Sequence, residues 1–158
     1  MIEICRATIQ ESEIIGEIHR QLNRPHRSEC NANEYLIAWC HGEPVGCAAT
    51  SLHAEGAYFY GLAVRRRWQH NGVGSQLMQA RLDALPATQT EYAVALVMFW
   101  NSRFFRKHGF SPVKRTLLPV SALYHSDLTD PSYVRSATML RWINASRIPT
   151  CGLRQTSF

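Results

Sequence analysis

Apolar positions along this 158-residue chain follow two spacings, and each spacing predicts one kind of element. Short apolar runs bounded by turn residues predict β-strands. Apolar residues three and four positions apart predict helices: one after the candidate N-cap Thr8, one between Gly72 and Pro86, and one over 102–108. The predicted strands cover residues 2–7, 35–40, 45–52, 57–64, 92–100, 110–117 and 137–143.

The order of these elements predicts the fold class. A strand, a helix, several antiparallel strands, a helix, a strand, a helix and further strands indicate an α/β (α+β) sandwich on a mixed sheet. The run 92–100 is apolar throughout, which is typical of a strand buried on both faces. Neither an internal repeat nor a low-complexity linker interrupts the chain, so residues 1–158 are expected to form one domain.

Composition narrows the class of protein. With 46% hydrophobic and 18% charged residues, the chain is not intrinsically disordered. Its net charge of +5 suits a phosphorylated cofactor and also nucleic acid, so the sign of the charge alone does not distinguish these two ligands. Five widely spaced cysteines and seven histidines lack metal-ligand spacing, so no metal is expected. No apolar run approaches the roughly 20 residues that span a membrane, and the expected location is cytoplasmic.

The stretch from Tyr60 to Leu77 carries the candidate chemistry. A predicted strand enters a polar loop with three successive arginines, 65–67, and Gly72-Val73-Gly74 then opens a helix. The first turn of a helix has amide groups without internal partners, and these donors favour bound phosphate. The loop has neither the G-x-x-x-x-G-K-[ST] pattern nor the Rossmann G-x-G-x-x-G pattern. We therefore predict a diphosphate-binding loop of another kind.

The pattern Leu-Ala-Val-x-x-x-x-Gln-x-x-Gly-x-Gly over 62–74 resembles the acetyl-CoA-binding signature of the GNAT superfamily of N-acetyltransferases. The segment Phe-Phe-Arg-Lys-His-Gly-Phe over 104–110 is similar to that superfamily's second conserved motif. The resemblance implies a mostly antiparallel sheet with helices on both faces and a V-shaped splay between two parallel central strands, 57–64 and 92–100. It also implies transfer of an acetyl group from acetyl-CoA to an amine by direct attack.

The resemblance further implies which residues bind the cofactor. The strand would pair with the pantetheine arm, and an amide near Leu62 or Ala63 would hold the thioester oxygen. The loop amides would hold the diphosphate, and the later helix would flank the arm. The cofactor residues implied in this way are Leu62, Ala63, Val64, Gln69, His70, Asn71, Gly72, Val73, Gly74, Ser75, Asn101, Phe104 and Phe105.

Proton transfer is where the chain departs from the family. Many members carry a glutamate where this chain has Tyr58, and a tyrosine that protonates the leaving thiolate where it has Phe105. Strand alternation predicts that Tyr58, Tyr60 and Leu62 share one face, which makes both tyrosines candidate catalytic residues. Two alternatives remain open: the tyrosines are packing aromatics, or a water molecule is the base.

The acceptor is less defined. The second motif is similar to short N-acetylglutamate synthase-like and arsenic-resistance-associated acetyltransferases, which implies an amino acid or related small amine as partner. Arg27 is the candidate for binding an α-carboxylate, with Arg24 and Arg115 as alternatives. Aminoacyl-tRNA or a protein amine remains an alternative acceptor, although nucleic acid is not the expected partner. A non-catalytic CoA-binding module is a further alternative, and both a monomer and a homodimer fit the sequence.

Overall fold

The structure is a computed structural model that describes residues 1–23 and 31–144. In this part of the chain a seven-stranded sheet has the order β1-β2-β3-β4-β5-β7-β6, and only the β4–β5 pair is parallel. The strands are β1 (Ile2–Arg6), β2 (Tyr35–Cys40), β3 (Glu43–His53), β4 (Gly56–Val64), β5 (Tyr92–Val97), β6 (Ser111–Pro112) and β7 (Ala137–Trp142).

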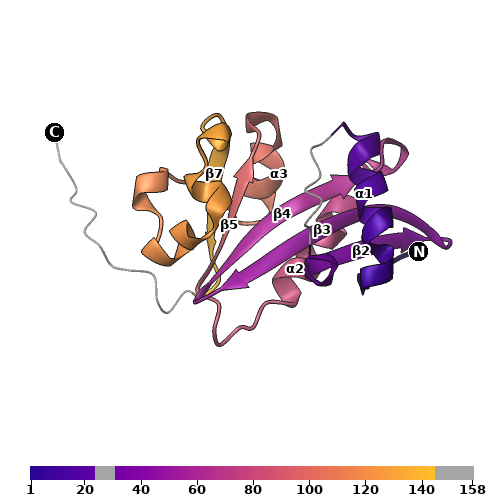
Figure 1. Cartoon of the computed structure of the whole chain (residues 1–158), viewed down its shortest axis with the longest axis horizontal. Helices are drawn as coiled ribbons and strands as arrows, with labels where there is room; N and C mark the ends of the chain where they lie inside the picture. Colours follow the sequence, from indigo (N-terminus) through magenta and orange to yellow (C-terminus); the bar gives the residue numbers. More distant parts are fainter. Residues whose placement is uncertain (24–30, 145–158) are drawn as a thin grey trace.

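Helices cover both faces of this sheet (Figure 1). The α-helices are α1 (Ser12–Gln21), α2 (Val73–Asp83), α3 (Ser102–Lys107) and α4 (Ser126–Thr129). Short 3₁₀ turns are η1 (Ile9–Glu11), η2 (Ala32–Glu34), η3 (Arg66–Trp68), η4 (Phe99–Asn101), η5 (Arg115–Leu117), η6 (Val120–Tyr124) and η7 (Pro131–Tyr133). On one face, Met78 of α2 and Phe105 of α3 pack on Phe59 of β4. On the other, α1 packs near β2 and β3, while η6 and α4 pack near β4 and β5.

The parallel central pair separates part-way along its length. The register of β4 with β5 runs from Gly56–Tyr92 to Phe59–Ala95 and then stops. β4 continues to Val64 without pairing with β5, and the two ribbons spread apart in Figure 1. The V-shaped splay is therefore confirmed, and within residues 1–23 and 31–144 no strand pairs with this edge of β4 beyond Phe59.

A β-bulge lies in this unpaired half of β4. Cys47 of β3 pairs with Ala63, whereas Ala49 pairs with Tyr60, so β4 has one residue more than β3 across this interval. Gly61 takes up the extra residue with φ of +61°, a backbone conformation that glycine adopts at no steric cost.

The bulge makes one sequence prediction wrong. Tyr58 and Tyr60 do share a face, but Leu62 packs with Val73 and Leu77 on the α2 face. Strict alternation predicted one face for all three residues, and the extra residue at Gly61 reverses the direction of every side chain that follows it.

Other element boundaries also differ from the predictions. β5 ends at Val97 because the chain turns into η4, where Phe99 and Trp100 are exposed. The strand predicted over 110–117 is reduced to the two residues of β6, and the chain turns into η5 at Arg115. The 3₁₀ turns and α4 between 115 and 133 were not predicted, because this segment has no clear apolar period.

The N-terminal capping signal is confirmed. The carboxylate of Glu11 accepts hydrogen bonds from the amide and the hydroxyl of Thr8, at 2.7 and 2.9 Å.

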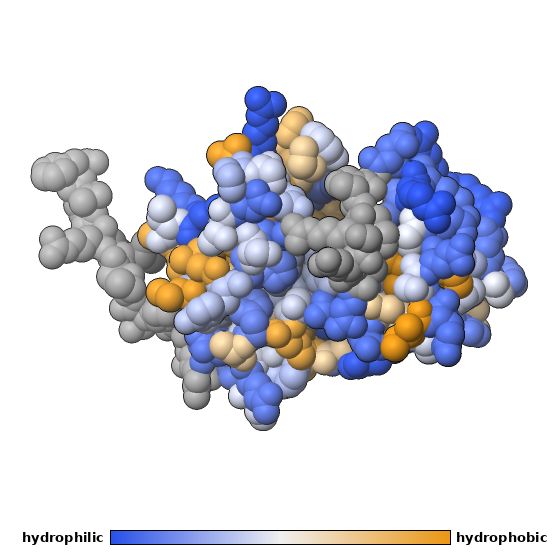
Figure 2. All heavy atoms as spheres, viewed as in Figure 1, coloured by the Kyte–Doolittle hydropathy of each residue, from blue (hydrophilic) through white to orange (hydrophobic). Residues whose placement is uncertain are grey.

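Among the residues that the structure describes, no helix has the length and apolar character needed to cross a membrane. Figure 2 shows mainly hydrophilic side chains over the α1 end of the molecule, with smaller and separate apolar patches elsewhere on the same face.

Candidate active site

The loop after β4 presents backbone amides at the start of α2. Gly72 is the N-cap of this helix with φ of +81°, and no side chain caps the first turn. The amides of that turn therefore point outward without an internal acceptor. The loop is held by its own side chains: Gln69 Nε2 donates to the Val64 carbonyl at 2.9 Å, and Asn71 Nδ2 donates to the Gln69 carbonyl at 3.1 Å. His70 has φ of +64°, an uncommon conformation for a residue other than glycine.

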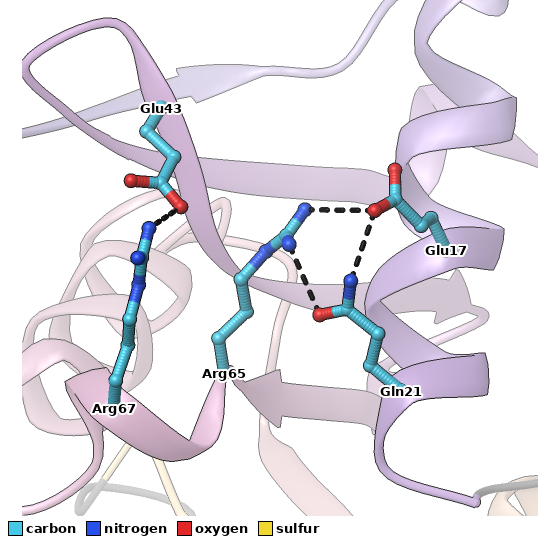
Figure 3. A network of polar contacts seen from close by, with 5 residues as sticks. All are labelled: Glu17, Gln21, Glu43, Arg65 and Arg67. Carbon is cyan, nitrogen blue, oxygen red and sulfur yellow. Dashed lines mark hydrogen bonds and ion pairs between the residues drawn. The ribbon is translucent and has the colours of Figure 1, made fainter.

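The three predicted loop arginines are not all available for an anion. Figure 3 shows Arg65 directed at α1, where it contacts Glu17 at 3.5 Å and Gln21 Oε1 at 3.0 Å. Arg67 forms an ion pair with Glu43, whereas Arg66 is exposed. The network therefore ties the loop to α1 and partly neutralises its charge, so the amides of α2 are the main anion donors of this loop.

The helix α3, which follows β5, lies on the other side of the splay from the loop after β4. Phe104 lies against Gly74, because a Cβ built on this glycine would be 3.7 Å from the phenylalanine ring. Asn101 lies at the start of α3 and is partly buried. Phe105, in contrast, is 6% exposed and packs edge-on against Phe110 in the core. The structure thus brings Phe104 to the start of α2 and places the Phe105 side chain in the core, while Asn101 lies at the start of α3.

A histidine directly after α3 contacts the first turn of α2. His108 Nε2 lies 3.3 Å from Ser75 Oγ, in the first turn of α2. Burial, and then the positive charges of Arg141, Arg81 and Lys107, lower the pKa of His108. An anion at the start of α2 would oppose that effect, because it favours the protonated imidazole.

A buried guanidinium lies under the bulge on the α2 face. Arg81 is 1% exposed, and its Nη1 donates to the carbonyl oxygens of Ala49 and Tyr60 at 3.2 and 3.4 Å. It also lies 4.4 Å from the ring centroid of Phe59, and burial lowers its pKa to about 9. Because Ala49 and Tyr60 are the pair beside the bulge, Arg81 supports the strands where their regular pairing is interrupted.

Tyr60 is the first residue of β4 beyond the end of the parallel pairing. Its hydroxyl donates a hydrogen bond to Oε2 of Glu34, which ends η2 directly before β2. Both side chains are partly exposed. The ring of Tyr35 packs edge-on against Tyr60 with centroids 5.8 Å apart, which fixes the orientation of Tyr60. A carboxylate is therefore present at one of the two predicted catalytic tyrosines.

Tyr58 has a different carboxylate partner. Its hydroxyl donates to Asp127 Oδ2 at 3.2 Å, and the two residues are 3% and 6% exposed. The His125 ring lies 3.7 Å from the Tyr58 ring, and its Nδ1 is 3.9 Å from Asp127 Oδ2. Tyr58 and Tyr60 stack with centroids 5.6 Å apart, so the predicted pair does form one cluster.

Sequence reasoning missed two carboxylates and a histidine of this cluster. Glu34, Asp127 and His125 carry no motif, and their approach to the tyrosines depends on tertiary structure alone. For the acceptor, Arg27 and its alternative Arg24 lie outside the described residues.

The other alternative for the acceptor carboxylate has structural partners of its own. Arg115 donates to the carbonyl oxygens of Tyr133 and Ser136 and to Thr138 Oγ1, which anchors η5 to the start of β7. Within residues 1–23 and 31–144, no three His, Cys, Asp or Glu side chains gather in a way that could hold a metal ion.

Comparison with known families identifies the class. The family model described as the acetyltransferase (GNAT) domain matches residues 31–112, which is more than half of the chain. The chain therefore belongs to the GNAT acetyltransferase family. The predicted superfamily, the fold class and the assignment to the acyl-CoA-dependent N-acetyltransferases are confirmed.

Solved structures share the fold. N-acetylglutamate synthase from Neisseria gonorrhoeae, in complex with coenzyme A and N-acetyl-glutamate, has a TM-score of 0.77 at 22% identity over 91% of this chain. The match covers 35% of that protein, so the present chain spans about a third of its length. A Mycobacterium tuberculosis protein in complex with CoA and NLQ has a TM-score of 0.74 at 19% identity, over 89% of this chain and 98% of that one. PaiA N-acetyltransferase from Thermoplasma acidophilum, in complex with coenzyme A, has a TM-score of 0.66 at 16% identity, over 90% of this chain and 99% of that one.

Proposed function

We propose that this chain transfers an acetyl group from acetyl-CoA to the primary amine of a small molecule by direct attack. One observation carries the proposal: the half of β4 that loses β5 as a neighbour is followed, after the loop 65–72, by the uncapped first turn of α2. A strand edge suits an extended amide-rich arm, and uncapped helix amides suit a diphosphate. Coenzyme A has both parts, and the three related structures described above contain it.

Each wall of the splay has a role in this proposal. The backbone of 62–64 pairs with the pantetheine arm, and an amide beside the bulge holds the thioester oxygen as it gains charge. The backbone amides of 69–75 hold the diphosphate, which requires no side chain from the buried Val73. Asn101 and Phe104 line the other side of the arm, while Phe105 supports Phe104 from the core.

Proton transfer falls to the tyrosine cluster. An ammonium group has no lone pair, so the acceptor must lose a proton before or during attack. Tyr58 and Tyr60 lie on the face of β4 opposite to α2, and each donates to a carboxylate. Phe105 has no proton to donate, so the leaving thiolate takes its proton from water.

The acceptor is proposed to be an amino acid or a related small amine. This rests on the likeness to a structure that contains N-acetyl-glutamate and on Arg27 as the partner of an α-carboxylate. Kinetics with glutamate and aspartate test it, since Arg27→Ala should raise the acceptor KM. Unchanged kinetics in that variant would remove Arg27 from the site.

The main test is thiol release from acetyl-CoA across a library of amines. A matched pair of variants, Gly74→Asp and Gly74→Asn, tests the phosphate site in the same assay. Gly74 suits this substitution, because a Cβ there makes only ordinary contacts of 3.7 Å or more. The aspartate should raise the KM for acetyl-CoA about tenfold over the asparagine, a difference of ~1.4 kcal/mol, because it repels the diphosphate. Absence of thiol release with every amine would overturn the proposed acetyl transfer, and absence of CoA binding as well would overturn the proposed cofactor site.

A further inference from the structure

The two candidate tyrosines differ in where their carboxylates lie, and this difference assigns them separate roles. Tyr60 donates to Glu34 at the partly exposed end of the cluster, whereas Tyr58 donates to Asp127 in its buried part. We propose that Glu34 is the proton-accepting partner of Tyr60 and draws the acceptor amine's proton away through the Tyr60 hydroxyl. This inference rests on the proposed acetyl transfer and names the group that replaces the missing strand glutamate.

Local structure holds Glu34 in place for this role. The side chain of Asn31 accepts a hydrogen bond from the Asn33 amide and caps η2, which ends at Glu34. The next residue, Tyr35, is 3% exposed and packs against the Tyr60 ring. Glu34 is therefore held on both sides along the chain, and its carboxylate accepts the hydrogen bond from the Tyr60 hydroxyl of β4.

Glu34 also has a route to solvent. It lines a cavity of about 280 Å³, whose other walls include Arg6, Asn33, Thr50 and Arg81. Asp127 does not line this cavity. A proton that reaches Glu34 can therefore leave to bulk water, whereas Asp127 is enclosed with Tyr58. This contrast is why the inference selects Glu34 rather than Asp127.

Every proton in the proposed reaction can be followed through Tyr60 and Glu34. The amine nitrogen forms a bond to the thioester carbon, and the carbon–sulfur bond then breaks to release the CoA thiolate. The nitrogen gives its proton to the Tyr60 oxygen as the Tyr60 proton passes to the Glu34 carboxylate. Glu34 returns that proton to water, and the thiolate takes one from water. Glu34 touches neither substrate nor cofactor, so it is a positioning residue that acts through Tyr60.

Charged and titratable groups from several elements surround Glu34. They are Tyr60 on β4, Tyr35 on β2, Arg6 on β1 and Arg81 on α2, and the His125 ring lies 6.3 Å from that of Tyr60. Arg6 and Arg81 are the two cationic side chains that line the same cavity as Glu34.

The test compares three variants with wild type in the thiol-release assay, using acetyl-CoA and the fastest amine of the library. Glu34→Gln keeps an acceptor for the Tyr60 hydroxyl but not a base, Glu34→Asp keeps the carboxylate, and Glu3→Gln is an exposed control on the edge strand β1. We expect Glu34→Gln to lower kcat about a hundredfold at pH 7, with the KM for acetyl-CoA within about twofold. Its kcat should continue to rise with pH where the wild-type value has levelled off. Glu34→Asp should restore the wild-type shape of the profile.

The outcomes separate this inference from the proposed function. If wild type releases thiol and Glu34→Gln keeps the wild-type kcat and pH profile, the inference is overturned while the acetyltransferase stands. It is likewise overturned if Glu34→Gln and Glu34→Asp lose activity equally with profiles parallel to wild type, because that result marks a purely structural role. If wild type releases no thiol with any amine, the proposed function fails and the inference fails with it.

Discussion

The two halves of β4 have the same neighbour on one side and differ on the other. Residues 56–59 pair with both β3 and β5, and all of them are buried. Residues 60–64 pair with β3 alone across a bulge, and only Ala63 among them is buried. A strand that is paired on both edges satisfies its backbone within the sheet, whereas the open half keeps one edge for a ligand.

The tyrosines extend this contrast to side chains. Tyr58 and Tyr60 are two residues apart and stack on each other, yet one belongs to the closed half and the other to the open half. Their chemistry is the same, so their surroundings decide what each one does. We propose that the buried Tyr58 has a structural role, and that Tyr60, which is partly exposed beside Glu34, passes protons.

The largest expected effect comes from Tyr60→Phe. Removing this hydroxyl breaks the link between the amine and Glu34, so kcat should fall about a hundredfold, the lower range for loss of general base catalysis. The KM for acetyl-CoA should stay within about twofold, because the proposed cofactor contacts come from the backbone of 62–64 and 69–75 and not from the Tyr60 hydroxyl. Steady-state kinetics measure both values. A variant that keeps more than half of the wild-type kcat would show that the halves of β4 do not differ in this way.

The second prediction concerns the bulge that separates the halves. A methyl group in Gly61→Ala would lie 2.6 Å from the Tyr35 hydroxyl and would adopt a strained φ. Because Tyr35 orients Tyr60, kcat should fall about tenfold, alongside a loss of ~1–2 kcal/mol in the free energy of unfolding.

Gly42→Ala is the matched control for that strain. Gly42 has φ of +75°, but a Cβ there meets nothing within 4 Å. The control should therefore be destabilised by a similar ~1 kcal/mol and keep wild-type kcat. Equal losses of kcat in both alanine variants would mean that strain alone, and not the displaced Tyr35, lowers activity.

The third prediction makes the same tyrosine-to-phenylalanine substitution in the closed half of β4, at Tyr58. Tyr58→Phe leaves the buried Asp127 without one donor, which should cost ~1–3 kcal/mol of unfolding free energy. Activity at a temperature where the variant is folded should stay within about threefold of wild type. Chemical denaturation and kinetics on the same sample give both numbers, and a large kcat loss in a stable variant would assign Tyr58 to the chemistry.

The sequence predicted the closed half of this strand better than the open half. Regular alternation and continuous apolar runs predicted β4, β5 and their burial, and the two GNAT motifs predicted the splay. The bulge had a signal, since a glycine inside a strand often marks one, but nothing in the sequence fixed its effect on Leu62. The carboxylates had no signal at all: Glu34 is 26 residues from Tyr60, and Asp127 is 69 residues from Tyr58. Such contacts depend on how loops fold back on the sheet, which local patterns do not encode.

The smallest expected effect uses two histidines at opposite ends of β4. His53 pairs with Gly56 at the closed end, and His108 contacts Ser75 beside the open end. Burial is the main cause that lowers the pKa of each. Only His108 lies beside the proposed phosphate site at the start of α2, so CoA should raise the pKa of His108 and leave that of His53 unchanged.

The expected pH dependence of CoA binding follows from the change in the pKa of His108. Between the lowered pKa of free His108 and its higher value with CoA bound, binding takes up a proton, so affinity rises as pH falls through this window. A shift of half a pKa unit corresponds to roughly a threefold change in affinity. NMR titration of the imidazole protons with and without CoA measures both histidines, and His108→Gln should remove the pH dependence measured by calorimetry. Equal shifts at His53 and His108, or none at either, would place the phosphates away from the open end of β4.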